Sequence, residues 1–155
     1  MRDKFVNQMR FWGMLCHLSA IAAWMLVIYL LFIGVPLYLP LNILAPLMIW
    51  RYKKAKYPWI DFQGKESLNF QISLTLYTLA FIIISLLILV IAFALSIIDN
   101  NIFSQVSIIF NGLLFGSLIL ILAELSFQLF VVNFAALKAY KGEHYRYPFT
   151  IRLLR

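Results

Sequence analysis

One carboxylic acid lies inside a long apolar stretch near the end of this 155-residue chain. Glu124 is the single charged residue between Ile102 and Leu137. An ionisable group within an apolar helix is costly, so it marks a candidate site for a proton, a cation or a partner's charge. The alternative is a neutral carboxyl that hydrogen-bonds between helices, because burial favours the uncharged form. Since no second carboxylate or lysine lies nearby in the stretch, the structural alternative has the better support.

Three further polar side chains could accompany this carboxyl. A helical rise of 1.5 Å per residue puts Trp24, Thr78 and Glu124 each about 20 Å from the nearest basic segment, and therefore at a similar depth. Gln128 lies one helical turn from Glu124 and is a local hydrogen-bonding partner. These four residues form the candidate intramembrane polar site.

A stripe of small and hydroxyl-bearing residues runs along the apolar stretch that begins near residue 66. Its members share one helical face because the steps between them are 4, 3, 7, 7 and 4: Gln71, Thr75, Thr78, Ser85, Ala92 and Ser96. Such faces let membrane helices approach closely, so we expect helix packing here. The functional alternative is one wall of a hydrophilic path for a translocating segment. Gly112 and Gly116 have the Gly-x-x-x-Gly spacing of a dimer face, which close packing within one chain explains equally well.

Cofactor and metal chemistry is not expected. The two histidines, His17 and His144, lie at different depths, which disfavours a haem held by both. Cys16 is the only cysteine, and a buried, inert thiol is its default state. The chain has no nucleophile elbow, phosphate loop or carboxylate pair, so we expect a non-enzymatic protein with no cofactor and no metal.

The elements that carry these residues are membrane helices. Hydrophobic residues make up 64% of the chain and charged residues 12%, about half the charged share of a soluble domain. The apolar stretches predict an all-α integral membrane four-helix bundle in a single transmembrane domain, residues 1–155. The expected helices span about 10–33, 38–51, 66–98 and 103–140, and a cytoplasmic tail follows at 141–155. The second helix is expected to be short and kinked, because Pro46 interrupts it.

The basic residues predict how these helices are oriented. Every Lys and Arg lies in 1–10, 51–65 or 138–155. Four crossings put these three segments on one side, and the positive-inside rule makes that side the cytoplasm. Both termini are therefore expected in the cytoplasm. The net charge of +7 is explained by topology and lipid headgroups, so no nucleic-acid partner is expected.

The polar joint, residues 61–71 (DFQGKESLNFQ), and the basic tail are predicted to lie on the same side of the membrane. We expect the tail to fold back on the joint and to pair Glu66 with Arg146 or Arg152. This arrangement is either a structural clasp at the interface, which we favour, or a surface that binds a cytoplasmic partner. The candidate interaction surface comprises Lys65, Glu66, Asn69, Gln71, Glu143, Tyr145, Arg146 and Arg152.

The joint and the tail also carry a family resemblance. Residues 63–71, read as QGKESLNFQ, and 142–148, read as GEHYRYP, resemble a bacterial membrane family catalogued as domain of unknown function 4870, as do 16–19 (CHLS) and 45–50 (APLMIW). That family is similar to the Tic-type chloroplast import component of about twenty kilodaltons, a four-helix group. Ser67 departs from the alanine expected there. The resemblance implies a bacterial inner membrane location and, by fold-level analogy, a scaffold or translocation-associated role.

The sequence as a whole predicts a multi-pass protein of the cell membrane. Our first hypothesis is a non-enzymatic accessory, scaffold or interaction subunit, whose partners are the lipid bilayer and either another membrane protein or a second copy of the chain. The alternative is a small transport or protein-translocation component, in which Glu124 and the Thr/Ser stripe line a path. An intramembrane enzyme or cofactor protein is a distant third.

Overall fold

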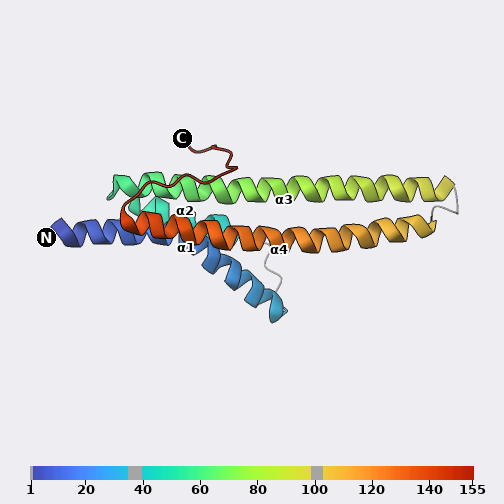
Figure 1. Ribbon diagram of the computed structural model, residues 1–155, viewed down its shortest axis with the longest axis horizontal. Helices are drawn as coiled ribbons and strands as arrows, with labels where there is room; N and C mark the ends of the chain where they lie inside the picture. The colour runs from blue at the N-terminus through green and yellow to red at the C-terminus, as the bar shows by residue number, and fades with distance from the viewer. Residues whose placement is uncertain (1, 35–39, 99–102) are drawn as a thin grey trace. The chain divides into compact units, whose positions relative to one another are not determined.

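The computed structural model describes residues 2–34, 40–98 and 103–155. Every secondary-structure element in these residues is a helix, which confirms the predicted all-α class. The four helices, coloured in chain order in Figure 1, are α1 (Arg2–Phe32), α2 (Leu41–Lys53), α3 (Pro58–Ile98) and α4 (Phe103–Lys141).

Two helices begin earlier than the sequence indicated. The first begins at Arg2 instead of about residue 10, and the third begins at Pro58 instead of about residue 66. Proline suits the first position of a helix because its missing N–H needs no partner there and its φ is already helical. Asp61 and Lys65 then form an ion pair one turn apart, at 2.6 Å, so these charges lie on the helix and not in a loop before it.

Three of the helices contain stretches long and apolar enough to cross a membrane: Asp3–Leu30, Pro58–Ser96 and Gln105–Lys141. The helix α2 has only 13 residues. Its length is about 20 Å, whereas a hydrocarbon core is about 30 Å thick. A short second helix with Pro46 inside it is therefore confirmed. A kink in it and a fourth membrane crossing stay predictions.

The chain divides into two compact units, and the first comprises Met1–Leu74 and Leu129–Arg155. Two apolar clusters form its core. One joins α3, α4 and the tail, through Phe70, Val131, Val132, Ala135 and Tyr147; the other joins α1 to the start of α3, through Cys16, Tyr57 and Ile60. The single transmembrane domain expected from the sequence stays a prediction.

The three basic segments meet at one end of this first unit. Tyr57 Oη donates a hydrogen bond to Gln8 Oε1 at 3.2 Å, which joins the N-terminal segment to the basic segment 51–65. Gln63 Nε2 donates to the carbonyl oxygen of Glu143 at 3.2 Å, which joins the joint to the tail. These contacts agree with the expectation that the three segments share one side of the membrane. Assignment of that side to the cytoplasm stays a prediction.

The second unit, Thr75–Gln128, contains the C-terminal half of α3 and the N-terminal part of α4. Most Leu, Ile and Phe side chains in it are exposed, as expected for surfaces that contact lipid. Within the stripe on α3, Ala92 and Ser96 are buried and Thr78 and Ser85 are partly buried, whereas Thr75 is exposed. This pattern supports the packing role of the stripe from Thr78 onward.

Candidate functional site

The tail begins at a well-defined helix end. The Gly142 N–H bonds to the carbonyl of Ala139 at 3.0 Å, and the Glu143 N–H bonds to that of Lys138 at 2.9 Å. This pair of bonds is the Schellman motif, which places a residue in the left-handed region just after the helix. Gly142 has φ +84°, and a Cβ there would lie 2.9 Å from Arg10 Nε. The motif turns the chain away from α4 and sends it back across α3.

A loop of three hydrogen bonds holds the first part of the tail. The tail backbone between Glu143 and Tyr147 closes this hydrogen-bond loop. Tyr147 Oη lies 2.8 Å from His17 Nδ1, and His17 Nε2 lies 2.8 Å from Gln63 Oε1. Gln63 Nε2 donates to the Glu143 carbonyl, which orients the amide oxygen toward the histidine. The imidazole therefore carries its proton on Nε2 and accepts at Nδ1. Burial raises the pKa of the Tyr147 phenol, which stays protonated and donates to that nitrogen.

Aromatic and hydroxyl contacts reinforce this loop. The rings of Phe70 and Tyr147 stack with their centroids 4.2 Å apart and an interplanar angle of 11°. Ser67 Oγ donates to the carbonyl of Cys16 at 2.9 Å, which joins α3 to α1 beside the histidine. A buried polar network makes a core rigid only when its donors and acceptors have hydrogen-bond partners. The hydrogen-bond loop through His17 therefore fixes α1, α3 and the tail in a single arrangement.

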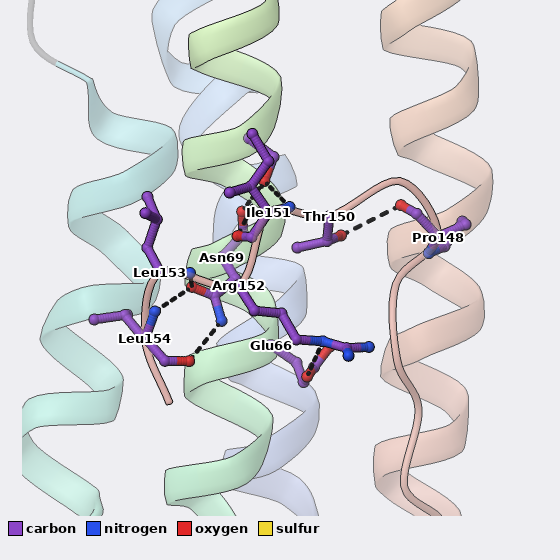
Figure 2. A network of polar contacts seen from close by, with 9 residues as sticks. Glu66, Asn69, Pro148, Thr150, Ile151, Arg152, Leu153 and Leu154 are labelled. Carbon is purple, nitrogen blue, oxygen red and sulfur yellow. Dashed lines mark hydrogen bonds and ion pairs between the residues drawn. The ribbon is translucent and has the colours of Figure 1, made fainter.

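The last residues of the tail lie in an extended segment along α3, and Figure 2 shows this segment beside the helix. The Asn69 side chain holds its backbone in three places. Asn69 Oδ1 accepts hydrogen bonds from the N–H groups of Leu153 at 3.1 Å and Leu154 at 2.8 Å, and Asn69 Nδ2 donates to the Leu154 carbonyl at 2.9 Å. The amide group thus pairs with the tail as a neighbouring β-strand would.

Two other residues on the same face of α3 complete the contact. Ser73 Oγ accepts a hydrogen bond from the Ile151 N–H at 2.8 Å, four residues along the helix from Asn69. Glu66, three residues before Asn69, is buried and faces Arg152, with Nε 3.8 Å from Oε1. We call Glu66, Asn69 and Ser73 the tail site. The expected fold-back of the tail on the joint is confirmed, and Arg152 is the arginine that meets Glu66.

The two other α3 residues of the predicted interaction surface have partners outside the tail. Lys65 pairs with Asp61 on its own helix. Gln71 is buried, and its Oε1 accepts a hydrogen bond from Asn42 Nδ2 on α2 at 3.2 Å. These contacts position the start of α3 against α2.

The three remaining tail residues lie close to the end of α4. Glu143 pairs with Lys138, and the hydrogen bond from that lysine lowers the pKa of the exposed carboxyl. The contact is therefore present above the ordinary pKa of a glutamate and is lost as the pH falls through the lowered value. Tyr145 packs edge-on against Phe134 at 5.3 Å, and Arg146 is exposed.

Sequence reasoning missed four residues of this arrangement: His17 as a hydrogen-bonding centre, Gln63, Ser73 and Tyr147. A signal existed for Ser73, because Glu66, Asn69 and Ser73 are spaced by three and four residues and so share a helical face. His17 was a polar residue in an apolar helix, but its partners lie 46 and 130 residues away in the chain. The spacing of residues near His17 therefore gave no indication of these partners.

The second unit brings together part of the predicted intramembrane polar site. Thr78 Oγ1 donates a hydrogen bond to Glu124 Oε2 at 3.0 Å, across from α3 to α4. Gln128 is buried one turn further along α4. The expected meeting of Thr78 and Glu124 is therefore observed, while their depth in the membrane and their role as a site stay predictions. Trp24 belongs to the first unit and is partly buried, and its place in this site stays a prediction.

Three long apolar helices, together with a polar joint bound to the tail, define an α-helical membrane protein. Comparison with protein families identifies the group. The chain belongs to MamF/MmsF, the magnetosome magnetite crystal formation protein family, whose family model matches residues 8–154. No curated protein and no solved structure matches the chain.

This assignment corrects the resemblance drawn from the sequence. The family that matches is neither the domain of unknown function 4870 nor the Tic-type import group. The quoted stretches mostly contain packing residues: Asn69 holds the tail, Tyr147 stacks on Phe70, and His17 hydrogen-bonds to Gln63 and Tyr147. Such residues specify how a tail folds onto a helix, and they discriminate poorly between families with a similar helical plan. The inference of a translocation-associated role from that resemblance loses its basis.

Proposed function

We propose that this chain is a non-enzymatic accessory or scaffold protein of the magnetosome membrane that takes part in magnetite crystal formation. The observation that carries the proposal is the family match, which extends over both compact units and nearly the whole tail. The chain would lie in the membrane by its long helices and present the tail and joint at one surface as the contact for other proteins. The expected membrane partner is another membrane protein or a second copy.

The rigid organisation of the first unit supports a contact role. The loop through His17, Gln63 and Tyr147 fixes the base of the tail, and the tail site fixes its end. Basic side chains remain exposed beside this arrangement, among them Lys54, Lys56 and Arg146. A surface that is both fixed and exposed suits recognition, because little conformational entropy is lost when a partner binds it.

Crystal formation in cells tests this proposal. Deleting the gene in a magnetite-forming bacterium that encodes the chain is expected to change the number or size of crystals seen by electron microscopy. Reintroducing the intact chain is expected to restore them. A chain that ends at Tyr147 is expected to reach the membrane but to restore crystals poorly, because it lacks the segment held at the tail site. Unchanged crystals in the deletion strain would contradict the proposal.

A second candidate function rests on the hydrogen bond between Thr78 and Glu124. A carboxyl that bonds across two apolar helices could bind a proton or a cation on a path through the membrane. Glu124→Gln removes the titratable group but keeps an oxygen that accepts from Thr78. We therefore expect this variant to keep its stability within about 1 kcal/mol and to restore crystals fully if the chain is a scaffold.

The transport alternative makes the opposite prediction for the same variant. Proton or cation flux through purified protein in liposomes should occur with the intact chain and stop with Glu124→Gln. Ser126→Ala is the matched control, because Ser126 is exposed on the same helix and, among the residues that the structure describes, bonds to the Leu122 carbonyl of its own helix, at 2.8 Å. If flux is absent from the intact chain and Glu124→Gln restores crystals, the carboxyl has a structural role.

A further inference from the structure

The tail is held in two separate parts with a strained turn between them. The first part, Glu143–Tyr147, is bound by the buried hydrogen-bond loop. The second part, Ile151–Leu154, is bound at the tail site. Between them the chain reverses at Pro148 and Phe149, where Thr150 Oγ1 lies 3.3 Å from the Pro148 carbonyl. Figure 2 shows this turn leading the chain from beside α4 toward α3.

The turn depends on an unfavourable backbone conformation. Phe149 has φ +54° and its side chain is 83% exposed. The left-handed region costs a residue with a side chain about 1–2 kcal/mol, and glycine is the residue that occupies it freely. Phe149 must adopt it for the end of the tail to reach the α3 of its own chain. Any arrangement that straightens this turn relieves the strain.

The tail site itself does not depend on the strained turn. Its hydrogen bonds from Asn69 and Ser73 go to backbone groups. The side chains of Ile151, Arg152 and Leu153 are exposed. Glu66 contributes the one contact to a side chain, Arg152, and its Oε2 is buried without a hydrogen-bond partner. The site therefore accepts an extended segment with a suitably placed arginine, by whatever route that segment arrives.

We propose that the tail site is an interface between two copies of this chain, in which the site of one copy binds Thr150–Arg155 of the other. The contacts are those seen within one chain, and the gain is release of the turn at Phe149. Exchange of an identical segment is a low-cost route to a dimer for this reason. The inference rests on the proposed scaffold function, and it names a second copy as the partner.

The geometry of a membrane favours such an exchange. The tail is fixed as far as Tyr147, so the segment that must move is short. At about 3.3 Å per residue, residues 148–155 extend about 26 Å from that anchor. Copies inserted in the same orientation hold the tail and the site at the same depth. Confinement to one plane raises the effective concentration of the second copy's tail at the site.

Cysteine pairing between differently tagged copies tests the exchange directly. One copy carries Ser73→Cys and the other Ile151→Cys, and both are expressed together and oxidised in their native membranes. The expected result is a disulfide-linked band that carries both tags, because position 73 of one copy lies next to position 151 of the other copy only when the tails are exchanged. A copy with Ser126→Cys replaces the Ser73 variant as the control and should give no such band. If both cysteines pair only when placed in one chain, the exchange is ruled out.

Substitutions at the turn separate exchange from chance collision in the membrane. Phe149→Gly removes the strain of the closed form and should lower the ratio of exchanged to closed chains about fivefold, as about 1 kcal/mol implies. Phe149→Val adds a β-branched side chain, which tolerates this conformation less well, and should raise the ratio. An unchanged ratio in both variants overturns the proposal. Because cross-linking is measured without reference to crystals, its failure is distinguishable from failure of the proposed function.

Discussion

Gly64→Ala is expected to lower the free energy of unfolding by about 3 kcal/mol, near the upper end of what overpacking costs. A Cβ at this position would overlap Trp50 Cδ1 and would lie 2.6 Å from its Cγ and 2.7 Å from its Cβ. The last atom is fixed to the backbone of α2, so rotating the ring does not remove the clash. Trp50 Nε1 also donates to Asp61 Oδ1 at 2.9 Å, which holds the ring in place. The helices α2 and α3 must therefore separate.

Two other glycines provide the matched control. Gly112 and Gly116 lie on α4, and a Cβ at either position meets no atom within 4 Å. Alanine is the better helix former by about 1 kcal/mol, so Gly112→Ala and Gly116→Ala should be neutral or stabilising. Reversible unfolding in mixed detergent micelles measures all three. Combining Gly64→Ala with Trp50→Ala should recover part of the loss, and additive losses would show that the two positions are not in contact.

The lengths of the apolar stretches and the positions of the charged residues were sufficient to predict the all-α class and the three long helices. They did not place the start of α3, because the charges at Asp61 and Lys65 and the glycine at position 64 have the composition of a loop. The structure uses each of them on a helix. Asp61 bonds to Trp50 and Lys65, and Gly64 admits the indole of Trp50. These roles depend on α2, whose position next to α3 is a tertiary feature.

The tail illustrates a second limit. Opposite charges at Glu66 and Arg152 indicated that the tail would fold back, and it does. The charges supply only a loose contact, at 3.8 Å, while most of the hydrogen bonds come from Asn69 and Ser73 to backbone groups. Hydrogen bonds to the tail backbone cannot be predicted from the tail sequence, since any residue in an extended conformation offers the same N–H and C=O groups. The fold-back of the tail was therefore predicted correctly, but the charge pair on which the prediction was based contributes less than the backbone hydrogen bonds.

The hydrogen bond between Thr78 and Glu124 was predictable for the opposite reason. Both residues are rare polar groups in long apolar helices, and helical rise fixes the depth of each. Their Oγ1 and Oε2 atoms lie 3.0 Å apart. The fixed rise per residue thus predicted the position of both residues along their helix axes. The same reasoning fails for His17 on α1. Its partners are Gln63 in the joint and Tyr147 in the tail, and a count of helical rise did not predict where these two residues lie.

Replacing His17 is expected to have the largest effect of any single polar substitution in the first unit. His17→Ala removes the acceptor for Tyr147 and the donor for Gln63, and both partners are buried. An unsatisfied buried polar group costs about 1–3 kcal/mol, and the lost ring leaves a cavity between α1 and α3. We expect the free energy of unfolding to fall by about 4 kcal/mol, the sum of two such groups. Unfolding in mixed micelles measures the change.

The two halves of the hydrogen-bond loop can be separated by a smaller change. Tyr147→Phe keeps the stacking on Phe70 and leaves one unsatisfied nitrogen on His17, so it should cost about 1–2 kcal/mol. His144→Ala is the control, because the exposed His144 ring packs edge-to-face with Trp59 and Phe62, and it should cost less than Tyr147→Phe. Both network variants should also make the tail more sensitive to a protease in intact membranes. Equal losses for the His17 and His144 variants would mean that ring packing, and not the hydrogen-bond loop, holds the tail against α1 and α3.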